Sequence, residues 1–391
     1  MTFSVADVNQ RLSTGTVSPG FEAVRNQLDA YLLADPAYSA QLSVYWNGEL
    51  IVDLAGGPDL TSDSVTGVFS VSKGISALVI AMLVRDGELG LDEPVARYWP
   101  EFAAEGKAAV TVRQLLSHQA GLVGLPGGMS FEELRDSSLA AARLADTFPD
   151  WLPGSAFGYH GLTIGVFMEE LTRRITGRSL QSVYESAIRA PHDIDFYLGF
   201  PAGQEHRFRE VLPMAPTSAQ QAEIDRRASA PDGITALAFN SAVRGPSVVD
   251  SPTSPNVREV RAAGPAAVGG IGSARGLARA YATAIGAAGA PALLDPGTVA
   301  RMTQQQVCGV DRVLNKVMCF GIVYMKPHQE VEFGSYRAFG HDGAGGALAF
   351  ADPAYGIGFG YIPMPIQYPG AADPKGVQLS TLVRSCIRLR S

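Results

Sequence analysis

The stretch Phe69-Ser70-Val71-Ser72-Lys73-Gly74 begins an apolar run that ends at Asp86-Gly87. The spacing of its apolar residues predicts a helix over Ser70 to Arg85. Three residues along a helix advance about 4.5 Å and return to nearly the same face, so the Lys73 amine can reach the Ser70 hydroxyl. Ser70 would also lie at the positive end of the helix dipole, which favours a developing oxyanion. Burial in the apolar run would lower the pKa of Lys73, and a neutral amine is a usable base.

This S-x-x-K pattern needs partners before it indicates chemistry. The chain has only five lysines, and Lys73 alone has a serine three positions earlier. Taken alone, the pattern is equally compatible with a serine that caps a helix beside a lysine whose charged end extends to solvent.

Strands are predicted near both ends of the chain. A helix over Pro19 to Leu33 precedes a hairpin in which residues 42–46 and 50–54 flank Asn47-Gly48, the pair that a type I′ turn favours. Two further strands are predicted over Gly346 to Phe350 and Gly356 to Ile362, followed by a helix over Gly376 to Arg388.

The middle of the chain is predicted to be mainly helical. Its helical patterns cover Ser70 to Arg85, Thr111 to Ser117, Phe131 to Ala145, Thr163 to Thr176, Ser179 to Ile188 and Ala274 to Ile285. Residues Pro231 to Pro265 show no periodicity and are interpreted as a long surface excursion that could border a substrate pocket, although the pattern on its own favours an ordinary ordered loop.

Composition excludes several classes of protein. The 391 residues are 46% hydrophobic and 18% charged, as in a globular protein with a sizeable core. The net charge of −7 argues against a basic surface that would bind nucleic acid. The N-terminal residues 1–15 lack the pattern of a signal peptide, and the longest strongly apolar run, Ala77 to Val84, is too short to span a membrane. We therefore expect a cytoplasmic protein with neither nucleic acid nor membrane as a partner.

Neither the cysteines nor the histidines indicate a metal site. Cys308, Cys319 and Cys386 are odd in number and contain no C-x-x-C pair, so we expect three reduced thiols that act as small core residues. The six histidines show no H-E-x-x-H or similar ligand spacing. No metal and no cofactor are expected.

Taken together, the motifs resemble those of the serine β-lactamase and penicillin-binding-protein superfamily, and within it the family VIII esterases, whose folds are similar to class C β-lactamases. Besides Ser70-x-x-Lys73, the resemblance rests on Pro153 to Gly161, which contains Tyr159-His160-Gly161, and on Phe339 to Gly346, which contains His341-Asp342-Gly343-Ala344. Residues 111–122 and 269–277 also match, as scaffold more than as chemistry. Each motif is weak alone, but their order and spacing are fairly specific.

The resemblance implies roles for the matched residues. Tyr159 would share proton transfer with Lys73, whose positive charge could lower the pKa of the phenol, although a half-buried aromatic is the common alternative for a tyrosine. His341, Gly343 and Ala344 would lie against the substrate, with the N–H groups of Ser70 and Ala344 as the oxyanion hole; a Gly-rich strand bend is the alternative. His118 and His160 are interpreted as structural.

Departures from the lactamase pattern point to a neutral substrate. Gly161 stands where lactamases carry the asparagine that orients a β-lactam carbonyl, and His341-Asp342 replaces Lys-Thr. The negative charge of Asp342 would disfavour an anionic β-lactam or a peptide carboxylate, whereas a neutral ester needs neither missing group.

Rival interpretations remain open. One alternative is excluded: an α/β-hydrolase carries its nucleophile in a G-x-S-x-G motif, and no serine in this chain has glycine both two residues before and two residues after it. An acyltransferase would use the same acyl-enzyme, a β-lactamase or D-amino-acid peptidase would share the motifs, and a catalytically silent scaffold would keep only the fold.

We predict an α/β (α+β) protein of β-lactamase-like fold, with an antiparallel sheet flanked by helices from residues 1–85 and 266–391 and a mainly helical region over 86–265. It would be a carboxylesterase acting on small neutral or short-chain esters, with Ser70, Lys73 and Tyr159 as catalytic residues. The partner would be a small-molecule ester, and a homo-oligomer is compatible with the sequence.

Overall fold

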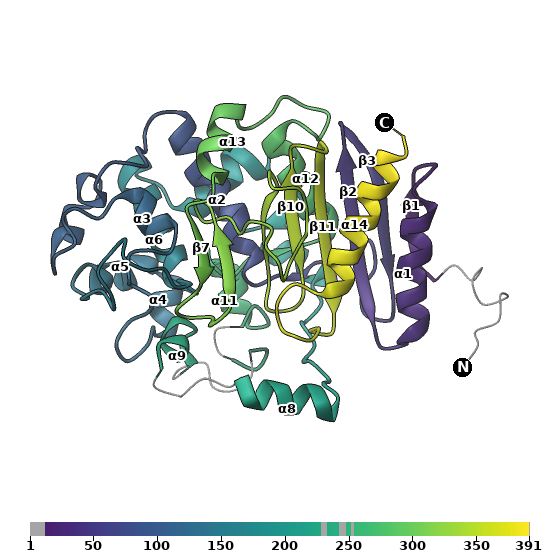
Figure 1. Ribbon diagram of the computed structural model, residues 1–391, viewed down its shortest axis with the longest axis horizontal. Helices are drawn as coiled ribbons and strands as arrows, with labels where there is room; N and C mark the ends of the chain where they lie inside the picture. The colour runs from purple at the N-terminus through teal and green to yellow at the C-terminus, as the bar shows by residue number, and fades with distance from the viewer. Residues whose placement is uncertain (1–11, 228–232, 242–247, 252–253, 391) are drawn as a thin grey trace.

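A six-stranded antiparallel sheet joins strands from the two ends of the chain, in the order β1-β3-β2-β11-β10-β9 (Figure 1). The computed structural model describes residues 12–227, 233–241, 248–251 and 254–390. The strands are β1 (Thr14–Val17), β2 (Ser39–Trp46), β3 (Glu49–Gly56), β9 (Phe339–Asp342), β10 (Leu348–Asp352) and β11 (Ile357–Met364). The predicted antiparallel sheet from both termini is confirmed, although β1 and β9 were not predicted.

The β2–β3 hairpin forms for the reason that the sequence gives. Asn47 and Gly48 have φ angles of 47° and 99°, so both turn residues are in the left-handed region that a type I′ turn requires. Residue pairing then runs from Trp46 opposite Glu49 to Ala40 opposite Gly56.

Helices cover both faces of the sheet. On one face, α12 (Ala274–Ile285) lies so close to β11 that a Cβ at Gly358 or Gly360 would come within 2.4 Å of a carbonyl oxygen of this helix. On the other face, α14 (Pro374–Arg388) packs with α1 (Glu22–Ala34), and Tyr361 of β11 contacts Gly376 of α14 (Figure 1). Alternate residues of β11 therefore serve the two faces, as the period of a strand requires.

Most predicted helices are present with small shifts at their ends. The remaining helical elements of the described residues are α2 (Val71–Arg85), α3 (Val112–Leu116), α4 (Phe131–Arg135), α5 (Ser137–Ala145), α6 (Thr163–Thr176), α7 (Leu180–Tyr184) with a π-helical turn over Glu185–Arg189, α8 (Ser218–Arg227), α9 (Ile234–Ala238), α11 (Arg258–Ala263), α13 (Pro296–Thr303), and 3-10 turns at Val95–Arg97, Pro100–Ala103 and Ala202–Arg207.

The single helix predicted over Phe131 to Ala145 is instead two helices. Asp136 has extended backbone angles, and its carboxylate accepts from the Ser138 N–H at 3.1 Å, so it ends α4 and caps α5. The helical periodicity continues through this break because α4 and α5 present apolar residues to the same core.

Within the excursion predicted over Pro231 to Pro265, the described residues include α9 and α11, so part of it is helical rather than irregular. The short stretches 228–232, 242–247 and 252–253 lie outside the described residues, and so do residues 1–11, the greater part of the stretch 1–15 on which the absence of a signal peptide was predicted. The proposed division at residues 85/86 and 265/266 remains a prediction.

The cysteine prediction is wrong for two of the three residues. Strands β7 (Val307–Val310) and β8 (Val317–Phe320) form a hairpin that places Cys308 opposite Cys319, and the two are joined by a disulfide with their Cα atoms 4.1 Å apart. Cys386 alone is free and buried. Strand pairing created this contact, which the sequence separation of 11 residues does not reveal. The argument from cysteines for a cytoplasmic location therefore fails.

Among the described residues, no helix has the length and apolar character needed to cross a membrane.

Candidate active site

Ser70 immediately precedes the first turn of α2, as predicted. The residue before it, Phe69, is buried and has a φ angle of 49°, a left-handed conformation that is strained for an aromatic residue. Ser72 fixes this turn because its hydroxyl donates to the Phe69 carbonyl at 2.5 Å and accepts from the Gly270 N–H at 2.9 Å. The chain thus turns sharply before Ser70, and its hydroxyl lies at the start of the helix.

Lys73 is fully buried beside Ser70. Its Nζ lies 3.0 Å from Ser70 Oγ and 3.0 Å from the carbonyl oxygen of Ala267. Burial lowers the pKa of Lys73 from its usual value to about 7, against an opposing attraction from Asp342. The predicted lowering of this pKa is confirmed, so a substantial fraction of Lys73 is neutral at pH 7.

Tyr159 completes the group that the motifs predict. Its side chain is 4% exposed, it hydrogen-bonds with Ser70, and its ring centroid lies 5.0 Å from Lys73 Nζ. The expected lowering of its pKa is wrong, because burial raises the pKa of the phenol well above its usual value and the hydrogen bond with Ser70 offsets only part of this. Tyr159 is therefore a neutral hydrogen-bond donor in the free protein.

His341, on β9, faces the same cluster, with its ring centroid 6.0 Å from that of Tyr159. Its Nδ1 lies 2.7 Å from the Asp342 carbonyl oxygen and 3.4 Å from Asp342 Oδ1, both acceptors, which assigns the Nδ1–H tautomer to the neutral ring. Nε2 is then an acceptor, and it is buried with no partner among the described residues.

Asp342 is held within the protein rather than lying free at the site. Its Oδ2 accepts from the Ala372 N–H at 2.9 Å, and its side chain is 15% exposed. Burial acts to raise its pKa, but the hydrogen bond with His341, the electrostatic interactions with His341 and Lys316, and the Ala372 N–H outweigh burial and hold the pKa at about 2. The carboxylate is charged at neutral pH and contributes a negative potential at Lys73.

Gly343 and Ala344 pass directly beside the Ser70 turn. A Cβ on Gly343 would lie 2.3 Å from the Val68 carbonyl oxygen, so only glycine allows this approach. Ala344 packs in an apolar cluster with Phe69. Neither the Ser70 N–H nor the Ala344 N–H donates to an acceptor among the described residues, as expected of groups reserved for a ligand oxygen.

The position at which lactamases carry asparagine is closed to a side chain. A Cβ on Gly161 would lie 2.6 Å from the carbonyl oxygen of Ala238, at the end of α9. Because the end of α9 packs against the segment that contains Tyr159, an asparagine side chain would not fit at position 161.

Two residues that position Tyr159 were not assigned that role from sequence. Asp311 Oδ1 accepts from the Tyr159 N–H at 3.1 Å, and His118 Nδ1 accepts from the His160 N–H at 3.1 Å. His160 in turn accepts from the Leu122 N–H at 3.2 Å, which agrees with the structural interpretation of both histidines. Asp311 follows the unpredicted β7 strand, so only its place beside a turn could have drawn attention to it.

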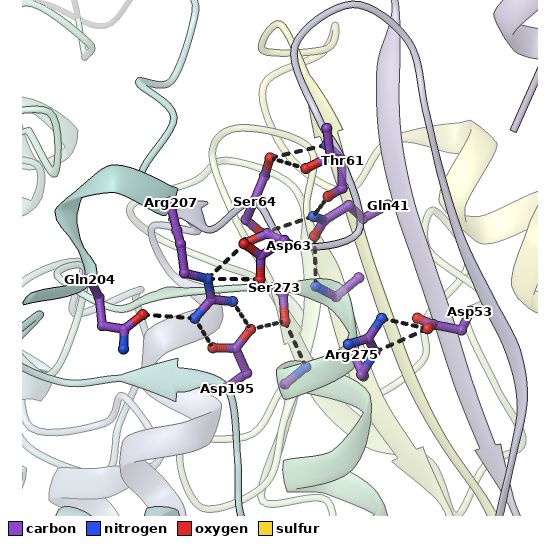
Figure 2. Close-up of polar contacts among 12 residues, drawn as sticks. Gln41, Asp53, Thr61, Asp63, Ser64, Asp195, Gln204, Arg207, Ser273 and Arg275 are labelled. Carbon is purple, nitrogen blue, oxygen red and sulfur yellow. Dashed lines mark hydrogen bonds and ion pairs between the residues drawn. The ribbon is translucent and has the colours of Figure 1, made fainter. Parts of the chain in front are cut away.

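A polar network, here called the clamp, holds the segment that leads to Ser70 (Figure 2). Arg207 donates to both oxygens of Asp195, at 2.9 and 2.6 Å, and to the Asp63 carbonyl at 2.9 Å. Ser273, the N-cap of α12, donates to Asp195 at 2.8 Å, and Gln41 Nε2 donates to the Ser64 carbonyl at 2.9 Å. The clamp therefore fixes the start of the path into Ser70.

From the clamp, the chain enters a small sheet before it reaches Ser70. Strand β4 (Thr66–Gly67) pairs with β6 (Ile271–Gly272), which also pairs with β5 (Phe196–Tyr197). Three separate parts of the chain are thus tied together one turn ahead of the nucleophile.

Comparison with known proteins places the chain in a family. The Beta-lactamase family model matches residues 28–363, most of the sequence. The chain belongs to the beta-lactamase family. Its fold is therefore the β-lactamase-like fold that the motifs predicted, and it is a serine β-lactamase-fold hydrolase by family.

Several relatives share nearly the whole chain. The structure of EstA from Arthrobacter nitroguajacolicus Rue61a is 48% identical with a TM-score of 0.89, covering 96% of this chain and 99% of that one. A family VIII carboxylesterase structure is 30% identical with a TM-score of 0.81 and the same coverage. Among curated proteins, Esterase/beta-lactamase LipL from Mycobacterium tuberculosis is 29% identical over 89% of this chain and 82% of its own length. The predicted resemblance to family VIII esterases is confirmed.

Proposed function

We propose that this protein is a carboxylesterase that cleaves small neutral esters through an acyl-enzyme on Ser70. The observation that carries the proposal is the buried Lys73 amine, 3.0 Å from Ser70 Oγ and with a pKa of about 7. An amine with this pKa can accept the serine proton at neutral pH and return it later in the cycle.

In the proposed reaction, Ser70 Oγ bonds to the ester carbonyl carbon while its proton passes to neutral Lys73. The N–H groups of Ser70 and Ala344 bind the oxyanion. Collapse of the tetrahedral intermediate expels the alcohol oxygen, which takes a proton from Lys73 through the neutral Tyr159 hydroxyl. Water then attacks the acyl-enzyme, gives its proton to the same pair and releases the acid, and Ser70 recovers its proton.

The walls of the site favour a neutral, partly apolar substrate. Phe69, Val211, Val249 and Ile366 form a buried apolar cluster against which Met214, Val248 and Ala344 pack. A substrate group next to Ala344 would meet this apolar surface. With Gly161 closed to a side chain and Asp342 charged nearby, an anionic β-lactam would lack two contacts and face one repulsion.

A panel of p-nitrophenyl butyrate and nitrocefin, assayed with the wild-type protein, tests the substrate class. We expect kcat/KM for the ester to exceed that for the cephalosporin by at least about 10²-fold, because the missing charge-assisted contact and the repulsion together are worth on the order of 3 kcal/mol. Comparable values for both substrates would replace the esterase with a lactamase or peptidase.

The variant Asp342→Asn tests the charge itself, since it keeps the shape of the side chain. It should raise the lactam rate more than the ester rate, whereas Glu330→Gln, which removes one charge from the exposed surface, should leave the ratio unchanged. Mass spectrometry after a fluorophosphonate should show one label on Ser70; an unlabelled protein would indicate a scaffold. Added alcohol acceptors would divert the acyl group to new esters if the protein is instead an acyltransferase.

A further inference from the structure

A cavity lies away from Ser70, next to the C-terminal end of α2. It has a volume of about 700 Å³ and lies between the C-terminal end of α12, helix α13 and the turn at Tyr336-Arg337. Arg85, the last residue of α2, donates to the Leu293 carbonyl at 2.7 Å, next to the lining residue Leu294. Since α2 has 15 residues and rises about 1.5 Å per residue, roughly 22 Å separates this end from the nucleophile.

The lining of this cavity combines one sign of charge with an apolar surface. Arg301, Lys326 and Arg337 line it, and no acidic residue does within the part of the chain that the structure describes. Ile285, Leu294 and Val299 supply the apolar part of the lining. A cavity of this size suits a small organic ligand, and this lining suits one with a negative end and an apolar body.

Lys326 is the unusual member of the cationic group because it is only 5% exposed. Its Nζ donates to the Ala338 carbonyl at 2.6 Å, which uses one of three N–H bonds. Asp352 attracts the ammonium, but Asp352 is itself fully buried and its oxygens accept from Ser335 and Ala354. Burial lowers the pKa of Lys326 to about 8, so an anion in the cavity would compensate a charge that is poorly solvated.

The two arginines are more exposed and leave donors free. Arg301 donates through Nη2 to Thr298 Oγ1 at 3.0 Å, and the Arg337 guanidinium makes no hydrogen bond or ion pair with the described residues. Tyr336, at the rim, is 87% exposed and offers an aromatic face. An arginine with free N–H groups can bind both oxygens of a carboxylate.

We propose that this cavity binds an amphiphilic monocarboxylate, with the carboxylate at Lys326, Arg301 and Arg337 and the alkyl chain on Ile285, Leu294 and Val299. A single carboxylate matches the buried ammonium and the guanidinium donors, while an alkyl chain removes the apolar lining from water. The proposal does not depend on the ester chemistry at Ser70, because Ser70, Lys73 and Tyr159 do not line this cavity.

Isothermal titration calorimetry on the Ser70→Ala protein tests separately the charged end and the alkyl chain of the ligand. Octanoate should bind one site with saturation, at least about 10-fold more tightly than octan-1-ol, which lacks the charge, and acetate, which lacks the chain, should not bind measurably. Octan-1-ol binding as tightly as octanoate would overturn the role of the cations. Acetate binding as tightly as octanoate would overturn the role of the apolar lining.

A pair of double variants locates the binding. In the Ser70→Ala protein, Arg301→Gln with Arg337→Gln should weaken octanoate binding at least about 10-fold. Arg135→Gln with Arg178→Gln removes the same charge from exposed positions outside the cavity and should leave the affinity unchanged. Equal affinity in the two double variants would place octanoate elsewhere, including at Ser70, and would overturn the proposal. Thermal unfolding of both proteins checks that they remain folded.

Discussion

The Ser70 site and the Asp195–Arg207 clamp are both polar clusters next to the β4 segment, but they differ in how their polar groups are paired. In the clamp, both oxygens of Asp195 accept from Arg207, and one also accepts from Ser273 (Figure 2). At the Ser70 site, the Nε2 atoms of His118 and His341 are buried with no partner among the described residues.

The difference in hydrogen-bond pairing predicts different effects of substitution on stability and on activity. A buried polar group that has its partners contributes to folding, whereas one that lacks them costs stability and is available to a substrate. We therefore expect substitutions at the Ser70 site to abolish activity at small cost in stability, and substitutions in the clamp to do the reverse.

The largest effect is expected for Ser70→Ala. Loss of the nucleophile should reduce ester hydrolysis by about 10³-fold or more, with an unchanged unfolding midpoint. Steady-state kinetics with p-nitrophenyl butyrate and thermal denaturation measure the two quantities. Ser76→Ala is the matched control, because Ser76 lies in the same helix, is buried, and donates to the Ala266 carbonyl at 2.9 Å; the variant should lose about 1 kcal/mol of stability and keep its activity. Activity of Ser70→Ala within about tenfold of wild type would remove Ser70 from the mechanism.

Lys73 should be almost as sensitive. Lys73→Arg keeps the positive charge but cannot act as a base at neutral pH, so we expect at least about 10²-fold lower kcat for this variant and for Lys73→Ala. Lys107 is a matched control, because it is also fully buried and donates to the Ala145 and Thr147 carbonyls. Lys107→Arg should change stability but not kcat. An active Lys73→Arg protein would show that charge alone is enough.

The dependence of kcat/KM on pH also tests Lys73 as the base, with a smaller expected effect on the rate. The pKa of Lys73 is lowered to about 7, and the neutral amine is the proposed base, so kcat/KM should rise with pH up to about 7 and then level off. Below this pKa, protonation of Lys73 should reduce the rate about tenfold per pH unit. Initial rates between pH 5 and 9, on an ester whose leaving alcohol does not change its ionisation over this range, measure the profile. A rate that is flat from pH 5 to 7 would contradict a neutral Lys73 base.

The structural features that depend on residues close together in the chain were predicted from the sequence. The Asn47-Gly48 turn, the helix after Ser70 and the approach of Lys73 to Ser70 all follow from periods and turn residues close together in the chain. The sequence did not predict the Cys308–Cys319 pairing or the raised pKa of Tyr159, because both depend on which distant segments pack together. The Phe320 and Phe239 rings, on the β8 hairpin and at the end of α9, each lie 6.0 Å from the Tyr159 ring. Burial among such groups raises the pKa of the phenol, and the charges of Asp342 and Asp311 add to this.

The smallest effect on activity is expected in the clamp, for Asp195→Asn. This change keeps the shape of the side chain but removes the carboxylate that pairs with two nitrogens of Arg207, which is 13% exposed and keeps its 3.2 Å ion pair with Asp63. We expect a loss of about 1–3 kcal/mol in the free energy of unfolding. The rate at saturating ester should stay within about threefold of wild type, because the clamp acts through the β4 segment and touches no proposed reacting atom.

Asp92→Asn is the control, since Asp92 makes the same paired contacts with Arg113, at 2.7 and 2.9 Å, but is 81% exposed. This variant should lose less than about 1 kcal/mol in the free energy of unfolding. Urea unfolding and kinetics on the three proteins give both quantities. A large fall in kcat for Asp195→Asn with normal stability would show that the clamp takes part in positioning Ser70, and that full pairing does not exclude a functional role.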